Sequence, residues 1–234
     1  MAFACLAFAG PAKAETTLEK VQRTGVLLCA AEERPGFAGE QGLALDFCRA
    51  VARAVAGPNA KVAFALPESD ADFAGLADVM FLSQDDIAEH GLASRIVVGP
   101  EVFRDPITLM VPETSAAKVP GDLAGHSICL MIGSPGQRAL EDRLSSLRPA
   151  IMRQSFSEDI ELLDAYNVGR CDAAVAETST LAAMRETRGI NGLRSRILAE
   201  PLAVTAILAA VPAGEAEWAE QVFGALRESL RRLP

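Results

Sequence analysis

The chain is poor in positive charge, in aromatic residues and in long apolar runs. Lysine and arginine number 22 against 31 acidic residues, which gives a net charge of −9 and argues against nucleic acid or an anionic membrane as partner. One tryptophan and one tyrosine leave little for base stacking. No stretch of about 18 uninterrupted apolar residues occurs, so we expect no transmembrane helix.

The cysteines lack the C-x-x-C spacing that is typical of zinc and dithiol redox sites. Ala12 and Ala14 form a signal-peptidase type site after a short apolar run, so we expect a signal peptide over residues 1–14, although it lacks a basic start. A buried first helix is the alternative. Removing the leader with Cys5 leaves four cysteines, for which three pairings exist, and an exported protein favours two disulfides.

Apolar segments of strand and helix length alternate along the chain, which predicts an α/β fold with largely parallel sheets. A chain of 234 residues with 50% hydrophobic content can build one large or two small domains. The expected strands are Val26–Ala31, Lys61–Leu66, Ala77–Leu82, Arg95–Val98, Ile107–Val111, Ser127–Ile132, Ala150–Ser155, Asp172–Ala176 and Leu202–Val211. The expected helices are Thr17–Gly25, Gly42–Ala56, a stub at Asp72–Leu76, Gln137–Leu147, Glu158–Tyr166, Ser179–Arg188 and Glu215–Leu233.

An acid at the tip of one short strand is the first candidate site residue. Residues 158–166 have helical spacing, Gly169 can end that helix, and the apolar run after Asp172 predicts a strand covered on both faces. Glu177 follows that strand, and ligands of open α/β sheets lie beyond the carboxyl ends of such strands. A solvated acid in a loop is the alternative for Glu177 taken alone.

The chain resembles the periplasmic solute-binding proteins of the polar amino acid ABC-transporter family (family 3), and its general L-amino acid binders in particular. The matching segments are Thr17–Gly25, Leu28–Cys29, Pro35–Phe37, Gly42–Ala52, Ala77–Val79, Met110–Pro112, Ile128–Gly133, Ala165–Asp172 and Glu200–Leu202. The resemblance implies a two-lobed type II binding protein fold with two crossover strands. It places lobe 1 at residues 15–111 and 205–234, and lobe 2 at residues 112–204.

The resemblance also implies one disulfide within each lobe, Cys29 with Cys48 and Cys129 with Cys171. It implies ligand binding in the cleft between the lobes, without cofactor or metal, and delivery to a membrane permease by a monomeric periplasmic protein. The ligand set it suggests is Arg34, Phe37, Ser83, His90, Ser134, Arg138 and Glu177.

The ligand site departs from the family's pattern. His90 stands where the family's T-x-x-R arginine holds the ligand's α-carboxylate, and Pro135 cannot offer the backbone N–H of the family's G-T-T turn. Glu177 replaces the usual aspartate and keeps the charge that receives an amino group. We therefore expect a small amino-acid-like or amine-bearing solute. Acids in the flanking loops (Glu32, Glu33, Asp85, Asp86 and Glu89) would favour an amine, and solvated loop residues are the alternative for them.

The sequence leaves two other functions open. Some proteins of this fold dehydrate small ring acids, and His90 or Glu177 could act as a general acid or base, although no second catalytic partner is identifiable. The weakened carboxylate clamp also fits an accessory or docking protein that has lost its ligand.

Overall fold

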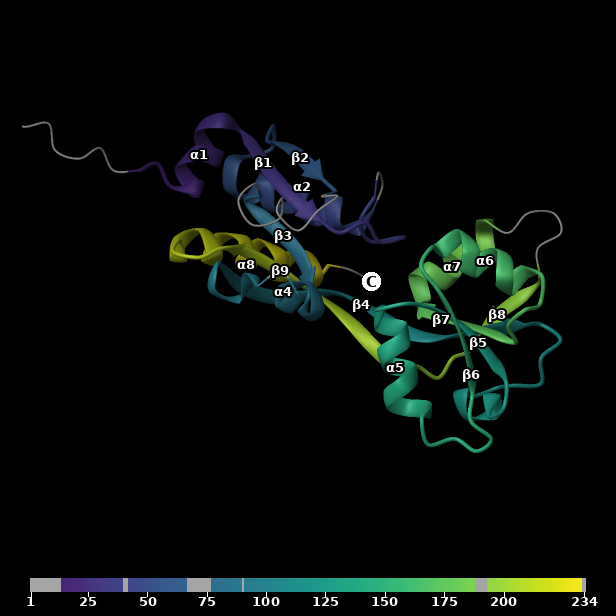
Figure 1. Ribbon diagram of the computed structural model, residues 1–234. Helices are drawn as coiled ribbons and strands as arrows, with labels where there is room; N and C mark the ends of the chain where they lie inside the picture. The colour runs from purple at the N-terminus through teal and green to yellow at the C-terminus, as the bar shows by residue number, and fades with distance from the viewer. Residues whose placement is uncertain (1–13, 40–41, 67–76, 90, 188–192, 233–234) are drawn as a thin grey trace, which may run out of the picture.

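The computed structural model describes residues 14–39, 42–66, 77–89, 91–187 and 193–232. Residues 1–13 of the expected signal peptide, the helix expected at Asp72–Leu76 and His90 lie outside these ranges. Within them the chain forms two α/β lobes joined by two long strands (Figure 1). No helix among the described residues is long and apolar enough to cross a membrane.

The first lobe combines the N-terminal third of the chain with its last helix. Its elements are α1 (Thr17–Thr24), β1 (Val26–Ala31), α2 (Leu43–Ala56), β2 (Lys61–Ala65), β3 (Val79–Ser83), α4 (Gln84–Glu89), the short η1 (Leu92–Ser94) and α8 (Ala216–Leu230). A Thr16–Glu19 capping box starts α1. The apolar stripe of α8, which includes Trp218 and Val222, is buried against α2 and the sheet, as its helical spacing predicts.

The second lobe is one continuous segment of the chain. It contains η2 (Pro120–Leu123), β5 (Ser127–Met131), α5 (Pro135–Leu144), β6 (Met152–Phe156), α6 (Asp159–Asn167), β7 (Ala173–Glu177), α7 (Thr178–Thr187) and β8 (Ser195–Ile197). Every residue of β7 is buried, with Val175 in one core and Ala174 in the other. This confirms a strand covered on both faces. The short strand β8 has no counterpart in the sequence-based assignment.

The two lobes repeat one plan. The strand order is β2-β1-β3 in the first lobe and β6-β5-β7 in the second, with all these pairings parallel. In each lobe an aspartate directly before one strand, β3 or β7, binds the backbone of the adjacent strand, β1 or β5. The Asp78 carboxylate accepts a hydrogen bond from the backbone N–H of Leu28 at 2.9 Å, and the Asp172 carboxylate accepts one from that of Ser127 at 2.8 Å. The same carboxylate-to-amide bond therefore fixes the register of each sheet.

Two crossing strands join the lobes. β4 (Ile96–Pro112) and β9 (Ala203–Pro212) pair antiparallel, and they complete a continuous sheet of order β2-β1-β3-β9-β4-β7-β5-β6. β9 pairs with β3 in the first lobe, whereas β4 pairs with β7 in the second. The expectation of two separate strands at Arg95–Val98 and Ile107–Val111 is therefore wrong. β-bulges between Val98 and Phe103 let one strand pass through the Gly99-Pro100 break.

The side chains along β4 change from one core to the other between Val102 and Ile107. Ile107 pairs with Ala203, and the amide of Leu202 donates to the carbonyl of Ile107 at 2.8 Å. We propose that the lobes meet near Asp105 and Thr205. On β4 this boundary precedes the expected one after Val111, since Leu109 and Val111 pack in the second lobe.

The two expected disulfides are confirmed. Cys29 on β1 is bonded to Cys48 on α2, and Cys129 on β5 is bonded to Cys171, which directly precedes Asp172 and β7. The bonded cysteines are 19 and 42 residues apart in the sequence. Each disulfide adds about 3–4 kcal/mol to the free energy of unfolding, because it restricts the unfolded chain.

Tyr166, the only tyrosine of the chain, is buried and hydrogen-bonded to the Ser195 hydroxyl at 2.9 Å. Burial raises its pKa to about 12, because a phenolate would lose its hydration. The unfolded phenol ionises near a pKa of about 10, so between about pH 10 and 12 the unfolded state binds fewer protons and stability falls as pH rises. We expect tyrosinate absorbance to titrate near pH 12 in the folded protein and near pH 10 in urea. A folded midpoint near 10 would contradict this.

Candidate functional site

A tight loop after β1 carries the first cation of the site. The backbone N–H of Arg34 donates to the carbonyl of Ala38 at 3.1 Å, and the N–H of Ala38 donates to the carbonyl of Arg34 at 2.8 Å. Gly36 turns the chain between them at a φ of 74°. Phe37 is buried at the base of this loop, where its ring stacks on Phe103 at 4.9 Å between centroids. The loop is therefore fixed on the first lobe, and Arg34 points away from it toward the second.

The Arg34 guanidinium reaches two carboxylates. Its Nη1 lies 3.5 Å from Oε1 of Glu177 at the tip of β7 and 3.3 Å from Oδ2 of Asp105 on β4. The side chains of Arg34, Asp105 and Glu177 are only 12%, 2% and 11% exposed. Thr205 on β9 also lies 3.5 Å from Glu177 Oε1. One cation thus bridges the first lobe, a crossing strand and the second lobe.

Asp105 is the fixed point of this group. Its Oδ1 accepts the backbone N–H of Ser179 at 3.1 Å, and its Oδ2 accepts the Ser179 hydroxyl. Thr178 donates in turn to the carbonyl of Pro106 at 2.7 Å. Asp105 therefore satisfies amide and hydroxyl donors at the start of α7, where negative charge is also favoured. Its Oδ2, which accepts the Ser179 hydroxyl, also accepts from Arg34.

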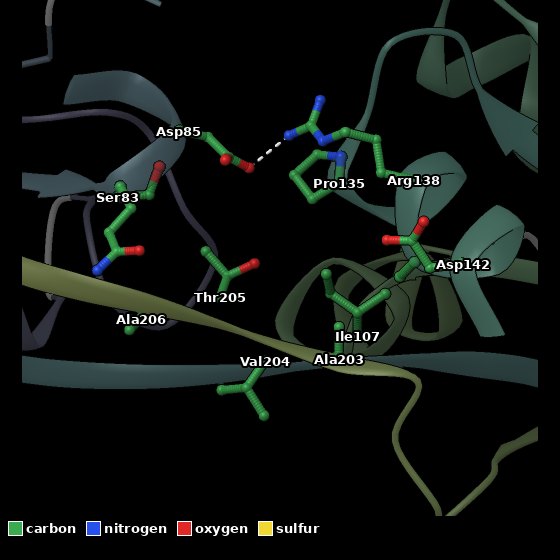
Figure 2. A pocket seen from close by; sticks show the side chains of 12 residues that line it. Ser83, Asp85, Ile107, Pro135, Arg138, Asp142, Ala203, Val204, Thr205 and Ala206 are labelled. Carbon is green, nitrogen blue, oxygen red and sulfur yellow. Dashed lines mark hydrogen bonds and ion pairs between the residues drawn. The ribbon is translucent and has the colours of Figure 1, made fainter. Parts of the chain in front are cut away.

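A second ion pair joins the lobes nearer to solvent. Arg138 on α5 contacts Asp85 on α4 (Figure 2). It also donates to the carbonyl of Gly133 at 2.8 Å. These two side chains are 44% and 51% exposed. Gly136 lets α5 approach β7, since a Cβ there would lie 3.1 Å from the carbonyl oxygen of Val175. That close packing places Arg138 at the space between the lobes.

Two of the cavities between the lobes share Ser83, Asp85, Pro135 and Arg138. One, of about 230 Å³, is also lined by Arg34 and Glu177. The other, of about 260 Å³, extends toward Asp142 and Thr205, which lie on opposite sides of it in Figure 2. The Asp85–Arg138 pair lies at both, so this contact divides the cleft.

The first cavity has a strong excess of negative charge. Its lining includes two arginines, Arg34 and Arg138, and six carboxylates, Glu32, Glu33, Asp85, Asp86, Glu89 and Glu177. A partly enclosed space of this kind attracts cations and concentrates their field. Among the described residues, no group of three or more His, Cys, Asp or Glu side chains is arranged so that it could hold a metal ion.

Four of the seven expected ligand residues, Arg34, Ser83, Arg138 and Glu177, line this one cavity. Ser134 lies beside it as the N-cap of α5, where its oxygen accepts from Gln137 and its hydroxyl donates to Met131. The structure does not bring Phe37 to the cleft, because its side chain is in the core of the first lobe. His90 lies outside the described residues.

The ligand set expected from the sequence lacks Asp105, and Asp85 is expected only as one of the acids of the flanking loops. Asp105 lies in a largely apolar stretch between Val102 and Val111, and an acid in such a strand is the signal that could have identified it. Its burial depends on partners 71 and 74 residues away, Arg34 and Ser179, which no local pattern identifies.

No protein-family model matches the chain. Two curated relatives align with most of it. YhdW of Escherichia coli (strain K12), provisionally assigned as an amino-acid ABC transporter-binding protein, is 26% identical over 230 residues, which cover 91% of this chain and 65% of YhdW. The general L-amino acid-binding periplasmic protein AapJ of Rhizobium johnstonii is 27% identical over 226 residues, with 92% and 66% covered. The chain thus spans slightly less than two thirds of the length of these relatives.

Solved structures share the fold. A periplasmic binding protein of an ABC transporter from Brucella ovis, determined with glutathione bound, superposes with a TM-score of 0.69 at 24% identity and covers 89% of this chain and 69% of its own. An ancestral arginine-binding protein bound to arginine gives a TM-score of 0.62 at 20% identity, with 89% and 93% covered. The two-lobed type II binding protein fold is therefore confirmed.

Proposed function

We propose that this chain, a divergent relative of the family 3 solute-binding proteins of amino-acid ABC transporters, binds a small amine-bearing solute between its lobes. The observation that carries the proposal is the acidic cavity with Glu177 at its buried end. A carboxylate in a partly desolvated site makes strong charge-assisted bonds to an ammonium group. The crossing strands allow the lobes to close over such a solute by hinge bending.

The geometry favours an ammonium group over an α-carboxylate as the feature recognised. Pro135 has no N–H, and the Ser134 hydroxyl already donates to the carbonyl of Met131 at 2.8 Å. The turn before α5 is therefore short of donors for a carboxylate. Arg138 is held by Asp85 and Gly133. Cationic amino acids, diamines and polyamines fit this site better than acidic amino acids.

The proposed setting is the periplasm, and the proposed partner is a membrane permease. Two disulfides in a chain of this size suit an oxidising compartment. AapJ is described as periplasmic, and both relatives are described as binding proteins, so binding is favoured over the dehydratase-like alternative. An accessory protein without a ligand is the remaining alternative.

A thermal-shift screen of the oxidised protein tests the proposal. We expect putrescine and L-arginine to raise the melting temperature and L-glutamate to leave it unchanged. A solute at 100 times its Kd stabilises the folded state by about 2.7 kcal/mol. A rise with L-glutamate alone would overturn the proposed ligand class. No response to any amino acid, polyamine or small organic acid would favour the accessory protein, and conversion of a solute would favour an enzyme.

A further inference from the structure

We propose that Arg34 is a resident cation that occupies the ammonium subsite and latches the lobes together before any solute binds. This rests on the proposed function, because it concerns the same cleft. The Arg34 guanidinium lies 3.5 Å from the Glu177 carboxylate, which is the group expected to receive a solute's ammonium. A cationic solute must therefore exchange with Arg34, and Arg34 becomes a determinant of specificity.

The position of Arg34 is fixed from both ends. Its backbone belongs to the loop closed onto Ala38 and held by Phe37 in the first core. Its guanidinium lies against Asp105, whose other oxygen is held by the Ser179 amide of the second lobe. Arg34 thus connects the first lobe with Asp105 on a crossing strand and with Glu177 in the second lobe.

The Arg34 contacts are less sensitive to salt than the contact of the second bridge, between Asp85 and Arg138. Arg34, Asp105 and Glu177 are nearly buried, so salt screens their attraction little. Asp85 and Arg138 are about half exposed, and exposed pairs contribute little to stability. At about 1 M NaCl, where the Debye length is about 3 Å, the outer pair is weakened and the Arg34 latch remains.

The latch also sets which solutes enter. Two acids face Arg34, so this group keeps one net negative charge with the guanidinium in place. A solute with one ammonium only replaces a cation that is already bound. A solute with two cationic centres can also bind the carboxylates of Asp85, Asp86 and Glu89, which line the same cavity. We therefore expect putrescine to bind more tightly than a monoamine of the same length.

The test compares Arg34→Gln with Arg49→Gln in the oxidised full chain. Arg49 pairs with Asp46 on the exposed face of α2 within the first lobe, so its substitution is a matched control. Small-angle X-ray scattering at 1 M NaCl without solute should give a larger radius of gyration for R34Q than for wild type. R49Q should have the same radius of gyration as wild type. Putrescine should return R34Q to the compact form.

Calorimetry with putrescine and n-butylamine gives the second measurement. If the latched state makes up about nine tenths of the unliganded protein, R34Q should bind putrescine about tenfold more tightly than wild type. Arg34→Lys, which keeps a single ammonium in place, should fall between them and serves if R34Q is too unstable to study. Melting curves of all variants establish that they are folded.

The outcomes separate the latch from the proposed function. An R34Q protein as compact as wild type without solute would overturn the latch. Weaker putrescine binding by R34Q would show that Arg34 contacts the solute instead of competing with it, which also overturns the proposal. If neither amine binds any variant while R34Q still opens, the latch is upheld and the proposed function fails.

Discussion

Replacing Asp105 by alanine is expected to lower the free energy of unfolding by about 3–5 kcal/mol, because it leaves a buried cation and two donors without their partner. The Asp105 side chain is 2% exposed and accepts from the Ser179 amide, the Ser179 hydroxyl and Arg34. Glu177 alone, at 3.5 Å, cannot compensate Arg34 fully. Asp105→Asn should cost less, since its amide oxygen still accepts from the Ser179 N–H.

Urea unfolding at neutral pH measures this difference directly. Glu101→Ala is the matched control, since Glu101 lies on the same strand and pairs with Arg104 at the surface. We expect less than about 1 kcal/mol there. Equal effects of the two alanine substitutions would mean that the Asp105 contacts do not contribute to stability, and the central position assigned to Asp105 would then be wrong.

Replacing Glu177 by glutamine is expected to weaken binding of putrescine by about 2–5 kcal/mol, which is about 30-fold to several thousandfold in Kd. Glutamine has the same size and keeps an acceptor oxygen, so the loss measures the charge of the anchor. The substitution also weakens the contact between Arg34 and the second lobe, while the Arg34–Asp105 contact remains. The solute then enters more easily, by less than the tenfold expected when Arg34 itself is replaced. The lost anchor outweighs that gain.

Calorimetry on the oxidised protein provides the comparison, with Glu161→Gln as control. Glu161 is exposed on α6, which packs near β5 and β6, and it does not line either cleft cavity. E161Q should bind putrescine as wild type does. Wild-type affinity in E177Q would place the ammonium subsite elsewhere in the cleft.

The parts of the fold that follow from local patterns were predictable. The buried run before Glu177, the helix that precedes it and the stripe of α8 each depend on residues close in sequence. The sequence-based assignment split β4, because Gly99-Pro100 and Asp105-Pro106 are ordinary strand breakers. In the folded chain β9 pairs along most of β4, and bulges absorb the irregular residues. Tertiary pairing overrides the local signal there.

The sequence predicted the carboxylate of the candidate site, Glu177, and did not predict that Arg34 pairs with it. Glu177 follows from its place at a strand end. Arg34 lies 143 residues earlier in the chain. The resemblance placed it at the same cleft, but no local pattern indicates that its guanidinium reaches Glu177 and Asp105. The resemblance placed Arg34 and Phe37 together in the ligand set, whereas their side chains diverge, one into the cleft and one into the core. Side-chain direction in a tight loop depends on the packing beneath it.

The pairing of Ile107 with Ala203 has a consequence for how the chain is assembled. The two ends of the second lobe are hydrogen-bonded neighbours at one point of an antiparallel ladder. The whole second lobe is thus an insertion at the tip of a β-hairpin whose arms are β4 and β9. Such an arrangement is modular, because a two-residue turn could in principle join the arms without changing the register in the first lobe. The lobe that carries Glu177 is separable by topology, and the hairpin that supports it is complete without it.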